Sequence, residues 1–102
     1  MSTFAVTTAK GPRWDDARGI REQAFFDEHA AFMDELVAGG VIVLGGPIDS
    51  DDAGVIALLA VVAPDEAAAR AVFSADPWLK HQVFRLKEIR AWTIWLDGRR
   101  SA

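Results

Sequence analysis

The sequence predicts an α+β domain in which two helices cover one face of a four-stranded antiparallel sheet. Segments with strand-like and helix-like periodicity follow one another in the order βαββαβ, and glycine or proline marks most of the boundaries. The length of 102 residues provides one hydrophobic core and no room for a second. We therefore expect a single domain over residues 1–102, with residues 97–102 as a frayed tail.

The first strand is predicted at residues 3–9, which alternate and are rich in β-branched types. This alternation places Phe4 and Val6 toward the core. The strand ends at Gly11-Pro12, and a charged loop follows it.

Helical spacing then runs from about Glu22 to Ala38. Gly39-Gly40 ends this helix, because glycine adopts the left-handed cap conformation without a Cβ clash. Its apolar residues fall on one side of the helix, and they are Phe25, Phe26, Phe32, Met33, Leu36 and Val37.

Two apolar strands are predicted next, at Val41–Leu44 and Val55–Val62. Gly45-Gly46-Pro47 closes the first of them, and we interpret this triplet as a turn. The residues from Ile48 to Ala53 are acidic and turn-like, and Gly54 opens the next strand.

The second helix is predicted at Glu66–Ser74, with Asp65 as its N-cap. Asp76-Pro77 ends it, because a residue before proline avoids the helical region. A short turn around Trp78–His81 leads to a final long strand at Val83–Leu96. The complete order βαββαβ is that of the ferredoxin-like fold.

Two helices cover only one face of such a sheet, yet two of the strands are apolar on both faces. The segment Val55–Val62 shows no alternation, which is typical of a strand buried on both sides. The last strand carries apolar residues in both phases, Trp92, Ile94 and Leu96 in one and Ile89, Ala91 and Trp95 in the other. We expect a homodimer that forms through the open sheet face; a monomer with an unusually apolar sheet is the alternative.

Composition excludes several classes of function. The net charge of −4 argues against a nucleic-acid-binding domain, which usually carries a basic face. There is no cysteine, and therefore no disulfide, thiolate metal ligand or cysteine nucleophile. The sequence shows no signal peptide and no apolar run long enough to cross a membrane, so we expect a cytoplasmic protein without membrane contact.

His29 is a polar residue in the apolar stripe of the first predicted helix. At ~100° per residue, it lies ~40° from Phe25 around the helix axis. A buried imidazole there needs a hydrogen-bond partner, or its desolvation costs roughly a few kcal/mol. Asp27 and Asp34 fall on the solvent side, and Glu22 could approach only from the helix start, two turns away, so the partner should come from another segment. Asp76, in the turn after the second helix, is our first choice.

This position has two interpretations. In the functional one, a carboxylate orients His29, which acts as a general base or acid near neutral pH. In the structural one, His29 is a core residue satisfied by a backbone carbonyl. The helix pattern alone favours the structural interpretation.

Other candidate binding residues flank the first helix. Trp14, Arg18 and Arg21 are candidates for binding an anionic or aromatic ligand at a pocket mouth, although arginines ahead of a helix are usually solvated. Gly46 and Pro47 are candidates for a segment whose backbone amides approach a ligand. The alternative is that they form only a turn.

The sequence offers no convincing metal or cofactor site. Asp49, Asp51 and Asp52 resemble a weak cation site but lack the downstream Gly and Glu of a calcium loop, which favours a solvated turn. His81, near Lys80 and Gln82, has no further ligands placed around it. No phosphate-binding loop follows Gly46, so we expect no cofactor.

Taken together, three features resemble the YCII-related (YciI-like) domain family. These are Arg21 followed by His29, then Gly46-Pro47, then Asp76-Pro77-Trp78. The stretches from Gly11 to Asp15 and from Trp92 to Leu96 look like one branch of the family, and the resemblance covers residues 3–96.

The resemblance implies a ferredoxin-like protomer of the dimeric α/β-barrel superfamily. It also implies a His–Asp pair in a pocket, carried here by His29 and Asp76, and Trp78 of the Asp-Pro-aromatic motif is a candidate substrate-binding residue. A related member removes chloride from a chlorinated hydroxyquinol. Arg21 stands eight residues before His29, farther than in many members, so the resemblance assigns it no role.

Three hypotheses follow. The first is a cofactor-independent lyase, isomerase or dehydrohalogenase that acts on a small cyclic or aromatic substrate through His29 and Asp76. The second is a non-catalytic small-molecule-binding or accessory domain, and the third is a structural dimer module in which His29 is core filler. An open cavity beside both residues favours the first two.

Overall fold

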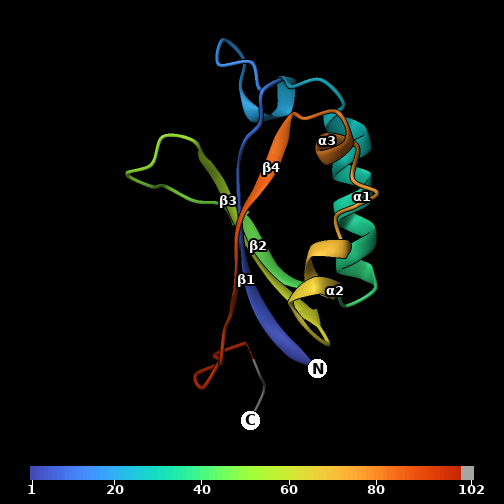
Figure 1. The fold of residues 1–102 in the computed structure, drawn as a ribbon, viewed down its shortest axis with the longest axis vertical. Helices are drawn as coiled ribbons and strands as arrows, with labels where there is room; N and C mark the ends of the chain where they lie inside the picture. Colours follow the sequence, from blue (N-terminus) through green and yellow to red (C-terminus); the bar gives the residue numbers. More distant parts are fainter. Residues whose placement is uncertain (100–102) are drawn as a thin grey trace.

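A computed structural model describes residues 1–99 and confirms the predicted α+β, ferredoxin-like class. The sheet has four strands, and Figure 1 shows the helices gathered on one of its faces. The elements in chain order are β1 (Ser2–Lys10), the 3₁₀ helix η1 (Ile20–Glu22), α1 (Phe26–Ala38), β2 (Ile42–Pro47), β3 (Val55–Ala63), α2 (Glu66–Ala71), α3 (Pro77–Lys80) and β4 (Phe84–Ala91). In the described residues, no helix is long and apolar enough to cross a bilayer.

The strands are antiparallel and lie in the order β2-β3-β1-β4. Because alternate residues of a strand point to opposite faces, the pairs Phe4–Val61 and Val6–Leu59 point toward the helices. Both pairs are buried, which confirms that Phe4 and Val6 face the core. Ile42, Phe73 and Ile89 complete the centre of this core.

The predicted start of the first helix at Glu22 is wrong, because α1 begins four residues later, at Phe26. Phe25 has a left-handed backbone (φ 62°), which interrupts the helical path before that point. The buried side chain of Gln23 accepts a hydrogen bond from Asp15 N at 2.9 Å and donates to Arg18 O at 3.0 Å. These bonds tie residues 20–23 to the preceding loop.

The interpretation of Gly45-Gly46-Pro47 as a turn is also wrong, because all three residues belong to β2. Gly45 pairs with Leu59 of β3, and a Cβ at this glycine would lie 2.4 Å from Leu59 Cδ2. The glycine therefore lets the two strands approach closely instead of reversing the chain.

The second half of the chain differs from the prediction in three places. Helix α2 ends at Ala71 rather than Ser74, and the residues predicted as a turn form the one-turn helix α3, capped by Asp76. Strand β4 ends at Ala91 rather than Leu96. Trp92 N still donates to Thr3 O of the partner strand β1. Because β1 begins at Ser2, the chain after Trp92 runs past the end of that strand and has no strand among residues 1–99 to pair with.

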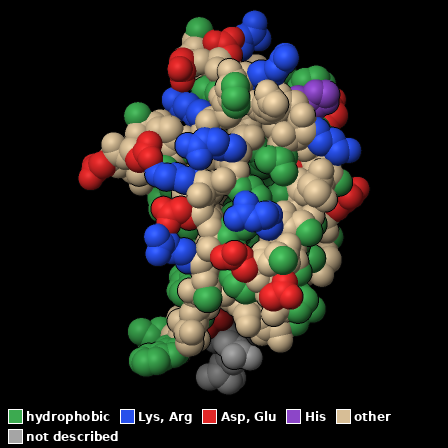
Figure 2. All heavy atoms as spheres, viewed as in Figure 1, with side chains coloured by type: hydrophobic (Ala, Val, Ile, Leu, Met, Phe, Trp, Pro, Cys, Tyr) green, Lys and Arg blue, Asp and Glu red, His purple; other side chains and the backbone are tan. Residues whose placement is uncertain are grey.

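The segment after β4 is apolar and projects from the sheet. Trp95 and Leu96 are 88% and 94% exposed, and Figure 2 shows apolar side chains gathered at its lower left, where this segment lies in Figure 1. Arg99 then returns to the free edge of β2, where its Nη1 donates to Val43 O at 3.3 Å. Of the predicted frayed tail, residues 100–102 lie outside the described part.

Gly11 fixes the start of β4 against the end of β1. Its N–H donates to Val83 O at 2.9 Å, and a Cβ added here would lie 2.3 Å from Gln82 O. We expect Gly11→Ala to lower the free energy of unfolding by about 1–3 kcal/mol, because the backbone must shift to make room. Urea denaturation tests this. Gly46→Ala is the control, since nothing lies within 4 Å of its Cβ position, and an equal loss in both variants would contradict the prediction.

Candidate functional site

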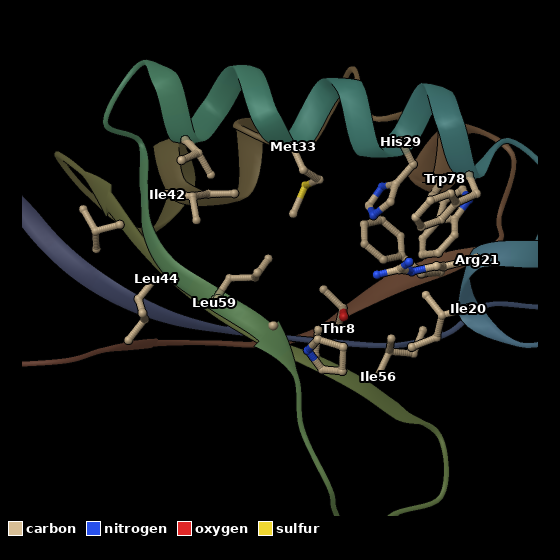
Figure 3. Close-up of a pocket in the computed structure, with 18 residues that line it drawn as sticks. Thr8, Ile20, Arg21, His29, Met33, Ile42, Leu44, Ile56, Leu59 and Trp78 are labelled. Atoms are coloured by element: carbon tan, nitrogen blue, oxygen red, sulfur yellow. The ribbon is translucent and has the colours of Figure 1, made fainter.

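A cavity of about 590 Å³ lies between α1 and the sheet. In Figure 3, His29 and Met33 project into it from α1, while Ile42 and Leu59 face them from the sheet. Its lining is mainly apolar, and the polar or charged side chains among the described lining residues are Thr8, Arg21 and His29, with the indole of Trp78. A largely apolar cavity with few polar groups is typical of a small-molecule site.

His29 reaches this cavity because it lies on the same face of α1 as Phe26 and Met33, three residues before it and four after it. Its ring nitrogen Nδ1 lies 2.9 Å from both carboxylate oxygens of Asp76. The His29 side chain is 12% exposed and that of Asp76 is fully buried. The structural interpretation from sequence expected His29 to bond to a backbone carbonyl. In the structure, Nδ1 contacts the Asp76 carboxylate instead.

Asp76 is held in place by the start of α3. Its Oδ1 accepts a hydrogen bond from Trp78 N at 2.9 Å, the usual contact of an N-cap residue. Pro77 occupies the first position of the helix, where a missing N–H is tolerated. Asp76 N also donates to Phe73 O at 3.0 Å. The carboxylate therefore has a fixed direction before it meets His29.

Aromatic rings fix the plane of the imidazole. The indole of Trp78 stacks on His29 with the ring centroids 3.9 Å apart and the planes at 6°, and Phe84 meets His29 edge-on at 5.3 Å. Trp78 is itself anchored, because its Nε1 donates to Ala24 O at 2.8 Å. The imidazole is thus held by a carboxylate on one edge and by rings around it.

This arrangement determines which nitrogen of His29 is free. An ionised carboxylate only accepts hydrogen bonds, so Nδ1 carries the proton that it shares with Asp76. In a neutral imidazole the other nitrogen, Nε2, then keeps its lone pair. A side chain of this kind, beside a cavity, is able to accept a proton from a bound molecule.

The structure brings some of the predicted binding residues to this cavity and not others. Arg21, Gly46, Pro47 and Trp78 line it together with His29. Arg18 does not; it is exposed and pairs with Asp15 at 3.3 Å.

Trp14 is the other predicted binding residue outside the described lining of this cavity. It packs edge-on against Trp78, with the ring centroids 5.7 Å apart, and lines a smaller neighbouring hollow. Trp14 therefore supports the ring that stacks on His29 rather than the cavity itself.

A family model of the YCII-related domain matches residues 8–93. The chain belongs to the YCII-related domain family. The matched residues include His29, Asp76 and every residue of the cavity lining, so the site lies within the YCII-related domain itself. Comparisons with curated proteins and with solved structures gave no match.

Sequence reasoning missed two residues that matter in the pocket of this YCII-related domain. Thr8 lines the cavity from β1, and Phe84 contacts the imidazole from β4. Thr8 could have been recognised from the sequence, because it is a polar residue in the same strand phase as Phe4 and Val6, which face the core. Phe84 carried no such signal, since its contact depends on the packing of β4 beside α3.

The remaining polar candidates lie away from the pocket. Asp52, in the loop of the YCII-related domain between β2 and β3, bonds to Lys87, and this hydrogen bond lowers the pKa of the Asp52 carboxyl. His81 stacks on Phe25, with their ring centroids 4.0 Å apart. Within residues 1–99, no group of three or more acidic or histidine side chains is placed to hold a metal ion.

Proposed function

We propose that this YCII-related domain is a cofactor-independent lyase, isomerase or dehydrohalogenase in which His29 is the general base. One observation carries the proposal: His29 binds a buried carboxylate through Nδ1 while its ring lines a cavity large enough for a small cyclic or aromatic molecule. The family resemblance supports the same pair of residues.

In the proposed reaction, Nε2 of His29 removes a proton from a carbon next to a carbonyl or phenol-derived carbonyl group. The electron pair of the broken C–H bond becomes the enolate, and Asp76 stabilises the imidazolium that forms. The enolate then either takes the proton back at another carbon, which is isomerisation, or expels a halide or other leaving group from the adjacent carbon, which is elimination. Arg21 and the backbone near Gly46 lie along the cavity, where hydrogen-bond donors would oppose the developing negative charge.

A substrate search tests the proposal. We would screen small cyclic ketones, hydroxylated aromatics and their halogenated analogues for an increase in melting temperature, then incubate each hit in D₂O with the protein. Proton NMR detects exchange or isomerisation, and halide release detects elimination. Conversion of a hit supports the proposal. Thermal stabilisation without any conversion would contradict catalysis and favour a binding module.

We also propose that two copies associate through the sheet face that carries no helix. Leu59 and Val61 point toward the helices, so Leu58 and Val62, which flank them in β3, point to the opposite face. Trp95 and Leu96 add exposed apolar surface beyond the sheet. The self-complementary partner for such a face is a second copy of this chain, because a two-fold axis pairs each apolar patch with its equivalent.

Leu58→Lys tests the dimer. We expect sedimentation equilibrium to give twice the chain mass for the unmodified protein, and Leu58→Lys to weaken association by at least about tenfold, since it buries a charge at the interface. Ala31→Lys adds the same charge to an exposed position of α1 and serves as the control. Dimers of equal strength in both variants would overturn this proposal.

A further inference from the structure

Thr8 is a buried side chain with an unused hydrogen-bonding group. The residue is 1% exposed, and within residues 1–99 its Oγ1 is the buried side-chain polar atom that has no hydrogen-bond partner. An unpaired buried hydroxyl costs about 1–3 kcal/mol, so native proteins rarely keep one. Thr8 also lines the cavity beside His29. This hydroxyl is therefore available to a molecule bound in the cavity.

The backbone around Thr8 is irregular on both sides. The pairing of β1 with β4 shifts register between Thr7 and Thr8, and its pairing with β3 shifts between Thr8 and Ala9. Such bulges redirect side chains and are frequent beside active sites. The same segment that leaves Thr8 without a partner therefore also departs from regular sheet geometry.

Arg21 provides a cation in the same cavity. Its side chain extends from η1 beneath Trp78 toward the cavity, as Figure 3 shows. Arg18, Arg90 and Arg99 each pair with a nearby acid, whereas Arg21 makes no ion pair or hydrogen bond with any residue of the described chain. The described cavity lining contains no Asp or Glu. The guanidinium is thus free to bind a ligand anion.

We infer that the pocket takes a small carboxylic acid, with Arg21 binding its carboxylate and the Thr8 hydroxyl bonding a second oxygen on the same molecule. This deepens the proposed function, on which it rests for the assumption that substrate binds beside His29. Guanidinium and carboxylate form two parallel hydrogen bonds, which fix orientation as well as position. Apart from His29 and the Trp78 indole, the polar side chains of the described lining are one cation and one hydroxyl, which fit a monoanion with an apolar ring better than a phosphate ester.

The ring of such an acid would lie between Met33 on α1 and Leu59 on β3, the apolar residues across the cavity. The Thr8 hydroxyl would then donate to the carbonyl or hydroxyl oxygen next to the carbon that loses its proton. A donor at that oxygen opposes the charge that develops in an enolate.

Binding measurements test the inference without requiring turnover. The probes are benzoate, its neutral counterpart benzamide, and 2-hydroxybenzoate, measured by calorimetry at low ionic strength. We expect benzoate to bind more tightly than benzamide, and Arg21→Gln to weaken benzoate by about tenfold while leaving benzamide unchanged. Arg18→Gln is the matched control, since Arg18 lies outside the described lining of the cavity. Equal binding of the two probes, or an equal loss in both arginine variants, would overturn the inference.

Thr8→Val tests the hydroxyl separately, because valine keeps the shape and removes the oxygen. We expect this variant to weaken 2-hydroxybenzoate about 2–10-fold more than benzoate. Its melting temperature without ligand should stay equal or rise, since an unpaired buried group is removed. A fall in melting temperature with no change in probe selectivity would assign Thr8 a purely structural role and contradict the inference.

The two proposals fail in different ways. If benzoate binds through Arg21 and no substrate is converted, the result contradicts the proposed catalysis and supports the carboxylate subsite. If the unmodified protein and Arg21→Gln convert a neutral substrate equally well, the result supports His29 as the base and contradicts the carboxylate subsite.

Discussion

His29→Asn is expected to lower the rate of proton exchange or elimination about 10²–10⁴-fold, because the general base is lost. Asparagine places its amide nitrogen close to the position of Nδ1, so it retains a hydrogen bond to Asp76 and leaves no group that accepts a proton at the position of Nε2. The free energy of unfolding should therefore change little. NMR exchange assays in D₂O and urea denaturation of the same preparation measure both quantities.

His81→Asn is the control for this variant. His81 is the second histidine of the chain, and it is exposed, stacks on Phe25 and lies outside the described cavity lining. We expect its activity to match that of the unmodified protein. Full activity in His29→Asn, or an equal loss in the two variants, would rule out His29 as the base.

Asp76→Ala is expected to lower the free energy of unfolding by about 1.5–5 kcal/mol. The change removes the N-cap of α3, which is worth about 0.5–2 kcal/mol, and leaves Nδ1 of His29 without its partner, which costs about 1–3 kcal/mol more. Activity should fall as well, because nothing then fixes the protonated nitrogen of His29. Urea denaturation followed by circular dichroism measures the stability.

Asp65→Ala isolates the capping contribution. Asp65 caps α2 through a bond from Ala68 N at 2.8 Å, is exposed, and makes no hydrogen bond or ion pair with a histidine of the described residues. We expect it to lose only about 0.5–2 kcal/mol. The difference between the two variants then gives the contribution of the His29–Asp76 bond. If both variants lose the same amount, that bond does not stabilise the fold.

Much of the fold could be predicted from local patterns. The unbroken apolar run of β3 and the alternation in β1 identify strands, and Asp65 marks the start of α2 correctly. The boundaries that failed depend on distant contacts. The start of α1 depends on hydrogen bonds from Gln23 to the loop at Asp15, and the end of β4 depends on where β1 begins. No periodicity within a segment reports such contacts.

The candidate site follows the same division. Helical spacing placed His29 in the buried stripe, and the lack of an acid within reach on its own helix pointed to Asp76, which the structure brings within 2.9 Å. The choice between Arg18 and Arg21 could not be made from sequence, because the turn of η1 decides which one reaches the cavity. The stacking of Trp78 on His29 likewise requires α3, a helix that the sequence pattern did not indicate.

The free edge of β2 has a consequence for how this protein behaves at high concentration. Unpaired strand edges recruit further strands and lead to fibrillar aggregates. Here the pairing with β3 shifts register between Ile42 and Leu44, Arg99 occupies Val43 O, and Pro47 offers no N–H. These features obstruct strand addition at that edge. Edge-to-edge growth of an open-ended sheet at β2 is therefore disfavoured.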